Sequence, residues 1–377
     1  MDFSLTEEQD MLRISARDFL AKECPKAKVR EMYKDERGYD TQMWLSMAEL
    51  GWMGLIFPEE YGGMAANFLD LVILMEEMGR NILPSPYFST VALCALPLLE
   101  YGNSDQKTNF LRQIAKGEAV WTFALGEESG TYKASDVKLR ALLEGTNYVL
   151  RGYKLFVTDA HVSDYILVVS RTGEGNSPEE GITLFIVDAK GPNVKMEAIP
   201  TIGGDRQFKI SFDSVVVSKD NILGKIDNGW DIVNFIFQRA AVLKCAEISG
   251  ACQSVLDITS SYAKERVQFD RPIGSFQAVQ HKLANMLIDV EAVQYLLYQA
   301  ACGISSGSPS PWQISAAKVK ANEVYQRICI EAIAIHGAIG YTIDHDIGLY
   351  YRRVKAAEFV AGDTDLHREV ISAGLGL

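Results

Sequence analysis

The chain has 377 residues and a formal net charge of −12, with 48% hydrophobic and 23% charged residues. These proportions are those of an ordinary globular protein with room for two or three subdomains. The acidic balance and the lack of a run of Lys and Arg argue against nucleic-acid binding. Nucleic acid is therefore excluded as an expected partner.

The N-terminal stretch MDFSLTEEQDMLRISARDFLAKE lacks the basic and apolar regions of a signal peptide and reads as an amphipathic helix. No apolar run reaches the roughly 18 residues needed to span a bilayer. The six cysteines are scattered and include no C-x-x-C pair, so neither disulfides nor a zinc site is expected. We expect a cytoplasmic protein with buried thiols, no metal site and no membrane span.

Residues 1–120 have helical periodicity. Thr6 to Gln9 resembles a capped helix start, and the segments 11–23 and 42–55 place apolar residues three and four apart. The segment 68–81 is another predicted helix, richer in core residues. The segment 83–102 opens with prolines that favour a helix start and continues almost wholly apolar. An N-terminal helical domain is predicted over 1–120.

Residues 121–225 change to short β-branched and aromatic runs separated by Gly, Asn, Asp and Pro, which predicts a small all-β domain, barrel or sandwich. Long helical patterns return over 226–377 and are typical of a helical bundle. The predicted fold is mostly α with a central all-β domain. No strand–helix alternation or Gly-rich phosphate loop is present, which argues against TIM-barrel and Rossmann folds.

Four motifs follow one another along the chain: FALGEESG (123–130), GYKLFVTDA (152–160), YAKERVQFDRPIGSFQAVQHKLANM (262–286) and AIAIHGAIGYTIDHDIGLYYRR (332–353). They resemble, in order, the A-L-T-E-P-x-x-G, G-x-K-x-W-I-T-N, R-x-x-F-G-x-P-I-x-x-F-Q and H-G-G-x-G-Y-T motifs of acyl-CoA dehydrogenases. The resemblance covers nearly the whole chain. It implies an FAD flavoprotein with an N-terminal helical domain, a β domain and a C-terminal four-helix bundle, usually tetrameric.

The resemblance implies that Arg266, Phe269 and Gln277 reach the FAD of a neighbouring subunit, and a planar guanidinium suits a pyrophosphate. It also places Gly337 and Ala338 beside a cofactor, where Ala338 replaces a motif glycine. A surface ion pair for Arg266 and a plain helix C-terminus at Gly337 are the alternatives.

Around the flavin ring the resemblance implies Phe156 and Thr158, in place of the family's Trp and Thr, together with Leu125 and Gly126. Phe156 keeps an aromatic face but lacks the indole donor, and Gly126 keeps only its backbone. Thr158 is expected to tune the flavin. A core aromatic is the alternative for Phe156.

The family reaction removes a proton from the acyl group with a carboxylate in an apolar pocket. The stretch FVAGDTDLHREV (359–370) aligns Ala361 with the commonest position of that Glu. The second known position is Gln238, whose amide accepts no proton at neutral pH. The catalytic base is therefore unknown. Asp363 and Asp365 fall where the family contacts FAD, and a helix N-terminus also favours acids there.

Three functions remain open: an acyl-CoA dehydrogenase with a relocated base and a cyclic or otherwise atypical acyl group, a base-less subunit of a heteromeric dehydrogenase, or a non-catalytic flavin-binding scaffold. Arg239, Tyr87 and Val91 are the expected substrate contacts, Arg239 with a helix-surface charge as its alternative. Electron-transferring flavoprotein is the expected electron acceptor. The chain is expected to form a homotetramer or a heteromer with a homologous subunit.

Overall fold

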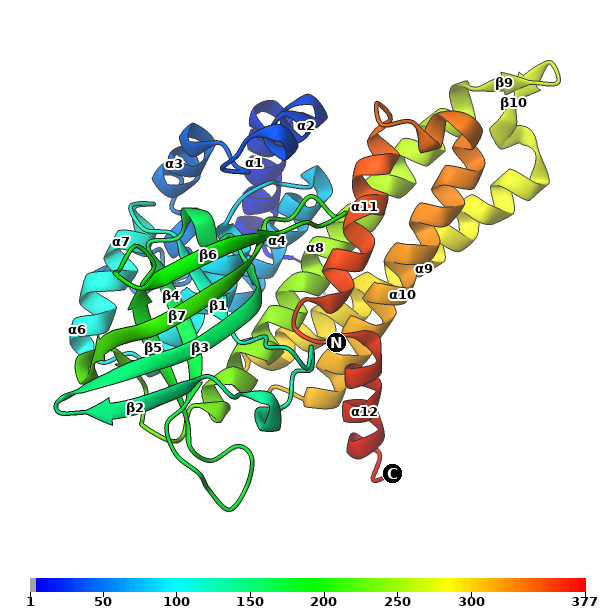
Figure 1. Cartoon of the computed structure of the whole chain (residues 1–377). Helices are drawn as coiled ribbons and strands as arrows, with labels where there is room; N and C mark the ends of the chain where they lie inside the picture. The colour runs from blue at the N-terminus through cyan, green and yellow to red at the C-terminus, as the bar shows by residue number, and fades with distance from the viewer. Residues whose placement is uncertain (1–4) are drawn as a thin grey trace.

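A computed structural model of the chain describes residues 5–377 and shows two helical parts flanking a central sheet (Figure 1). The predicted fold class is confirmed. The helices of the first part are α1 (Glu7–Glu23), α2 (Lys26–Lys34), α3 (Thr41–Glu49), α4 (Phe68–Asn81), the π-helix η3 (Phe88–Ala95), α5 (Leu96–Tyr101), α6 (Ser104–Gln106) and α7 (Arg112–Ala115).

Side-chain hydrogen bonds cap the N-termini of α1 and α4. Thr6 and Gln9 form a reciprocal capping box at the start of α1, as the sequence predicts. Asn67 and Asp70 form the same device at α4. Gln9 also donates to Asp70 over 2.9 Å, so the two caps hold α1 and α4 together.

The proline-rich segment differs from an ordinary α-helix, because η3 winds with the wider π-helical turn before α5 begins. The Thr90 hydroxyl lies on η3 and accepts from the Trp121 N–H at 3.0 Å. The same hydroxyl also lies 3.3 Å from the Trp121 carbonyl oxygen. These contacts fasten η3 to the first strand of the sheet.

The central sheet has the strand order β6-β7-β3-β2-β4-β5-β8, with β1 paired in parallel to β4. Its strands are β1 (Trp121–Ala124), β2 (Arg140–Glu144), β3 (Asn147–Thr158), β4 (Tyr165–Arg171), β5 (Ile182–Asp188), β6 (Val194–Ile199), β7 (Gln207–Ser218) and β8 (Ile222–Leu223). The pairing of β3 with β7 loses register between Lys154 and Val157. This irregularity turns the intervening Phe156 outward.

The second helical part lies beside the sheet on the right of Figure 1. Its helices are α8 (Trp230–Glu265), α9 (Gln277–Ser305), α10 (Pro311–His336), α11 (Asp346–Phe359) and α12 (Thr364–Gly374). A small hairpin, β9 (Val267–Gln268) and β10 (Arg271–Pro272), joins α8 to α9 and projects away from the sheet (Figure 1). No helix within residues 5–377 combines the length and apolarity needed to cross a membrane.

Helices α4 and α8 cross at two glycines. A Cβ on Gly79 would lie 1.9 Å from the Glu247 carbonyl oxygen, and a Cβ on Gly250 would lie 1.8 Å from that of Glu76. Only glycine permits this approach of two backbones. The N-terminal helices and the C-terminal bundle therefore form one continuous core.

Candidate active site

The end of β3 carries an outward-facing aromatic ring. Phe156 is 54% exposed and has a φ of 57°, in the left-handed region. The preceding Leu155 donates its N–H to the Gly126 carbonyl over 2.8 Å. The loop after β1 and the end of β3 are thereby held side by side, which brings together Leu125, Gly126, Phe156 and Thr158 as the motifs imply.

A buried ion pair fixes this junction. Lys154 Nζ lies 2.7 Å from Glu127 Oε1, and Lys154 is fully buried. The Lys154 ammonium also donates to the Leu125 carbonyl at 3.0 Å. Burial lowers the pKa of Lys154 to about 8, and the charge of Glu127 opposes that shift. Both are motif residues, the Lys of G-x-K-x-W-I-T-N and the Glu of A-L-T-E-P-x-x-G, but their pairing was not predicted.

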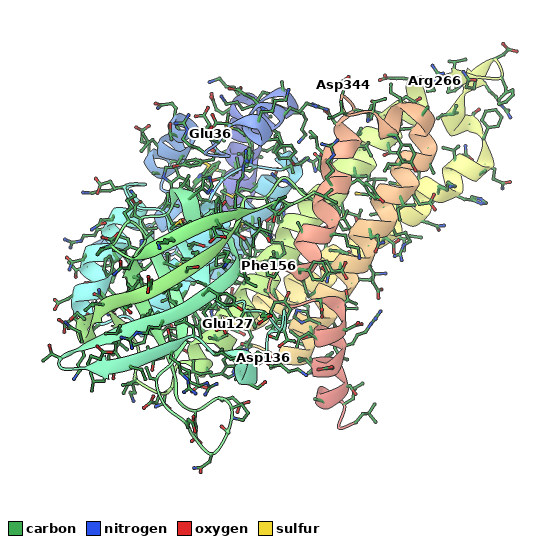
Figure 2. The ribbon with its side chains drawn as sticks, viewed as in Figure 1. Glu36, Glu127, Asp136, Phe156, Arg266 and Asp344 are labelled. Carbon is green, nitrogen blue, oxygen red and sulfur yellow. The ribbon has the colours of Figure 1, made fainter. Side chains whose placement is uncertain are left out.

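These residues fit a planar cofactor. Within residues 5–377, neither the Gly126 N–H nor the Thr158 hydroxyl has a hydrogen-bond partner, and both belong to the two segments that meet at Leu155 and Gly126. Free donors beside an aromatic face suit the edge of a flavin, whose ring atoms need hydrogen bonds from the protein. Figure 2 shows Phe156 and Glu127 where the sheet meets the C-terminal helices.

A cavity of about 220 Å³ contains both positions at which the base was expected. Ala361 and Gln238 line it together, although Gln238 lies on α8 and Ala361 in the turn between α11 and α12. Its other lining residues are Tyr132, Trp230, Asn234, Phe237, Pro311, Ile314, Ser315, Leu366, His367 and Val370. None of the residues lining the cavity has a carboxylate.

A buried lysine, Lys318, donates hydrogen bonds to backbone carbonyls around the turn that contains Ala361. Ala361 has a φ of 57° and Gly362 a φ of 102°. Lys318 Nζ donates to the Glu358 carbonyl at 2.9 Å and lies 3.3 Å from the Gly362 carbonyl. An ammonium in this position satisfies carbonyls left free at the end of α11. The position of Ala361 in the cavity wall is therefore fixed.

His367 does not replace the missing carboxylate. Its Nε2 lies 3.0 Å from the Ala361 carbonyl oxygen, and its Nδ1 lies 3.0 Å from the Ser315 hydroxyl. Because a carbonyl only accepts, Nε2 carries the proton and Nδ1 accepts from Ser315. Burial, together with the nearby charge of Lys318, lowers the pKa of His367 to about 4. Both ring nitrogens are thus occupied and the ring is neutral.

The two acids after Ala361 have different surroundings. The Asp363 carboxylate accepts from the Leu366 N–H at 2.8 Å and is the N-cap of α12. Asp365 is exposed in the first turn of α12 and pairs with Arg368 at 3.1 Å. Both line a polar groove beside the cavity. Their contact with FAD remains a prediction.

The expected substrate residues lie outside the lining of this cavity. Tyr87 and Val91 are each 2% exposed, and the Tyr87 hydroxyl donates to the Trp52 carbonyl over 2.8 Å. The Arg239 guanidinium stacks on Phe235, 3.4 Å from the ring centre. None of the three is among the residues lining the cavity that contains Ala361 and Gln238.

A second group of predicted cofactor residues lies far from Phe156. Figure 2 places Arg266 and Asp344 at the distal end of the C-terminal helices. Phe269 is 86% exposed on the projecting hairpin, and Gln277 begins α9. Gly337 and Ala338 follow the end of α10 in the short helix η9 (Gly337–Tyr341). One chain therefore does not bring the two groups together.

A half-exposed ring with free donors, a largely apolar cavity and a helix–sheet–helix fold are typical of a flavin-dependent oxidoreductase. Models of the acyl-CoA dehydrogenase N-terminal, middle and C-terminal domains match residues 6–118, 122–215 and 227–376. The chain is 31% identical to the probable acyl-CoA dehydrogenase YngJ of Bacillus subtilis, and the match covers all of both chains. It belongs to the acyl-CoA dehydrogenase family, whose members are FAD-dependent oxidoreductases acting on acyl-CoA.

Two solved structures extend this similarity. Butyryl-CoA dehydrogenase from Megasphaera elsdenii superposes with a TM-score of 0.94 at 28% identity, covering all of both chains. A chain of the ChsE4–ChsE5 complex from Mycobacterium tuberculosis superposes with a TM-score of 0.91 at 27% identity, covering 100% of this chain and 99% of that one.

Proposed function

We propose that this chain dehydrogenates an acyl-CoA thioester with a cyclic or otherwise atypical acyl group, using a base outside the two usual positions. The observation that carries the proposal is that Ala361 and Gln238 line one cavity and neither is an acid. The rest of the cavity wall is largely apolar and includes Ile314, Leu366 and Val370.

In this proposal Leu125, Gly126, Phe156 and Thr158 hold the flavin of their own subunit. Bound FAD supplies the hydride acceptor, and electron-transferring flavoprotein removes the electrons. Arg239 helps to hold the acyl-CoA. Tyr87 and Val91 are buried, and in this proposal they help to define the shape of the site that binds the acyl group.

The distal residues support an oligomer. Arg266 lies at the end of the bundle far from Phe156 (Figure 2), Phe269 lies on the hairpin between β9 and β10, and Gln277 begins α9, which fits contact with a neighbour's FAD. Gly337 and Ala338 lie in the same distal region, and Asp363 and Asp365 complete the predicted cofactor set. A homotetramer or a heteromer with a homologous chain would meet this need. The cysteines described are all unpaired, which supports a reducing, cytoplasmic location.

The proposal is tested with the purified full-length chain. We expect a flavin absorbance spectrum that bleaches when a suitable acyl-CoA is added anaerobically. Ala361→Glu and Gln238→Glu should each create ordinary α,β-dehydrogenation of butyryl-CoA, because a carboxylate in an apolar wall has the raised pKa that a base needs. Absence of flavin that cannot be reconstituted, or no gain in either variant, would contradict a competent pocket.

The second candidate is a base-less subunit of a heteromeric dehydrogenase. The ending GDTDLHRE resembles that of chains in such complexes, and the fold similarity to a chain of the ChsE4–ChsE5 complex supports this reading. An inert chain that gains activity on mixing with a co-encoded homologue would favour it. Bound flavin that no acyl-CoA reduces, with or without a partner, would favour the third candidate, a non-catalytic scaffold.

A further inference from the structure

A carboxylate that no motif singled out lies directly after Thr158. Asp159 Oδ2 accepts from the Ser89 hydroxyl over 2.7 Å. Asp159 Oδ1 has no hydrogen-bond partner within residues 5–377, and the residue keeps partial exposure despite dense surroundings. One oxygen is therefore held by Ser89, and the other has no partner among the described residues.

Asp159 links two segments that are expected to hold the ligands. Its chain neighbour Thr158 is expected at the flavin, and its partner Ser89 lies between Tyr87 and Val91, the expected wall of the acyl pocket. The motif G-x-K-x-W-I-T-N has Asn at this position. This chain therefore carries an acid at the junction of flavin and acyl group while lacking one at Ala361 and Gln238.

The surroundings favour a carboxylate that exchanges protons near neutral pH. Burial raises the pKa of Asp159 to about 7, and the charge of Asp205 in the loop before β7 adds to the rise. The Ser89 hydroxyl on η3, Lys244 on α8 and Arg353 on α11 oppose it. A base with a pKa near the working pH is the most effective kind.

We propose that Asp159 is the proton acceptor of the acyl group, replacing the carboxylates missing at Ala361 and Gln238. The inference rests on the proposed acyl-CoA dehydrogenation. In the step, a C–H bond of the acyl group breaks and its proton forms an O–H bond on Asp159 Oδ1. The electron pair remains on the substrate as the thioester-stabilised enolate.

A purely structural role makes a different prediction. Asp159 has a φ of 60°, and both Asp and Asn tolerate the left-handed region. Asp159→Asn keeps that backbone preference, the side-chain shape and an acceptor for Ser89, but removes the basic oxygen. If Asp159 has only a structural role, the Asp159→Asn variant should keep proton transfer. If Asp159 is the base, the variant should lose it.

The test follows proton exchange rather than flavin reduction. The flavin-loaded protein is incubated in D2O with butyryl-CoA or cyclohexanecarboxyl-CoA, and deuterium uptake is measured by mass spectrometry. Wild type should exchange, and Asp159→Asn should slow exchange by at least about 100-fold at unchanged flavin content. The matched control Asp205→Asn removes a neighbouring acid and should keep exchange.

Exchange in Asp159→Asn at the wild-type rate, or no exchange in wild type with either thioester, overturns the proposal. Butyryl-CoA could reduce the flavin of the Ala361→Glu variant while the wild type catalyses no deuterium uptake by either thioester. That result would support the proposed function and contradict the role of Asp159 as the base. If Asp159→Asn does not fold, Ser89→Ala decides. Losing the Ser89 hydrogen bond raises the pKa of a base at Asp159, so the exchange profile should move to higher pH. An unmoved profile overturns the proposal.

Discussion

Lys154 and Glu127 face each other across 2.7 Å in the interior, two residues before the exposed ring of Phe156. Glu127 also accepts from the N–H groups of Lys138 and Leu139 at distances of 3.0 to 3.1 Å. The carboxylate therefore ties the loop after β1 to the strand β3 and to the segment before β2. Removing one partner of this ion pair should destabilise the sheet and also the neighbouring segments that are predicted to bind the edge of the flavin.

Lys154→Met should lower the free energy of unfolding by about 3–5 kcal/mol, because the Glu127 charge would remain buried without its partner. Urea unfolding measures this loss. Flavin retention after gel filtration should fall in the same variant, since Leu125 and Gly126 lose their anchor.

The control is the exposed ion pair, 2.9 Å long, between Arg151 on the same strand as Lys154 and Glu144 on β2. Arg151→Met should change the free energy of unfolding by less than about 1 kcal/mol, because exposed pairs contribute little. Equal losses in the two variants would contradict a special role for the buried pair.

His367 should make stability fall in mild acid. Its pKa is about 4 in the folded chain against an ordinary value of 6.5. The unfolded chain therefore binds a proton between these values when the folded chain does not. The contribution of about 3 kcal/mol is fully present above pH 6.5 and is lost as the pH falls toward 4. Urea unfolding at several pH values measures it.

His367→Gln should reduce the loss of stability between pH 6.5 and pH 4. The variant also lacks packing contacts of the ring, which lowers its stability at every pH. Ser315→Ala provides the graded comparison. It removes a hydrogen bond that favours the neutral ring, so the pKa should rise and the acid-sensitive window should narrow. An unchanged slope in His367→Gln would assign the acid sensitivity to other groups.

Asp363 allows its capping role to be separated from its predicted contact with FAD. Asp363→Ala should cost about 1 kcal/mol of stability, since α12 loses its N-cap. Asp363→Asn keeps a capping oxygen and should cost at most about half as much. A fall in FAD affinity in Asp363→Asn without a matching loss of stability would reveal a cofactor contact.

The sequence predicted the long elements well because their periodicity reflects one buried face. Helices α1, α4, α8, α9 and α10 and strands β3, β4, β5 and β7 follow their patterns. The strands β2 and β6 were not predicted, because most of their residues are exposed or only partly buried and little apolar alternation results. The π-helical form of η3 was also not predicted, since periodicity distinguishes it poorly from an α-helix.

The candidate site was predicted only where a motif runs along the chain. Ala361 and Gln238 were identified as the usual base positions one at a time, and the structure shows that they line one cavity. The pairs Lys154–Glu127 and Ser89–Asp159 were missed because each joins separate segments, the second across 70 positions. Such contacts depend on how the elements pack and leave no local pattern.

Phe269 offers a test of the predicted contact between subunits. Its ring is 86% exposed, and its aromatic partner is Phe276, 6.0 Å away. Phe269→Ala should therefore change the stability of the fold by no more than about 0.5 kcal/mol. If the ring covers the FAD of a neighbouring subunit, the variant should bind FAD about tenfold more weakly, as the loss of one aromatic contact implies.

Ile202→Ala is the matched control, since Ile202 is 88% exposed and lies in a different part of the chain, after β6. FAD titration by fluorescence and analytical ultracentrifugation are measured for both variants. Ile202→Ala should behave as wild type in both measurements. FAD affinity in Phe269→Ala equal to that in Ile202→Ala would contradict the contact, because an exposed ring that touches no cofactor can be removed without affecting flavin binding.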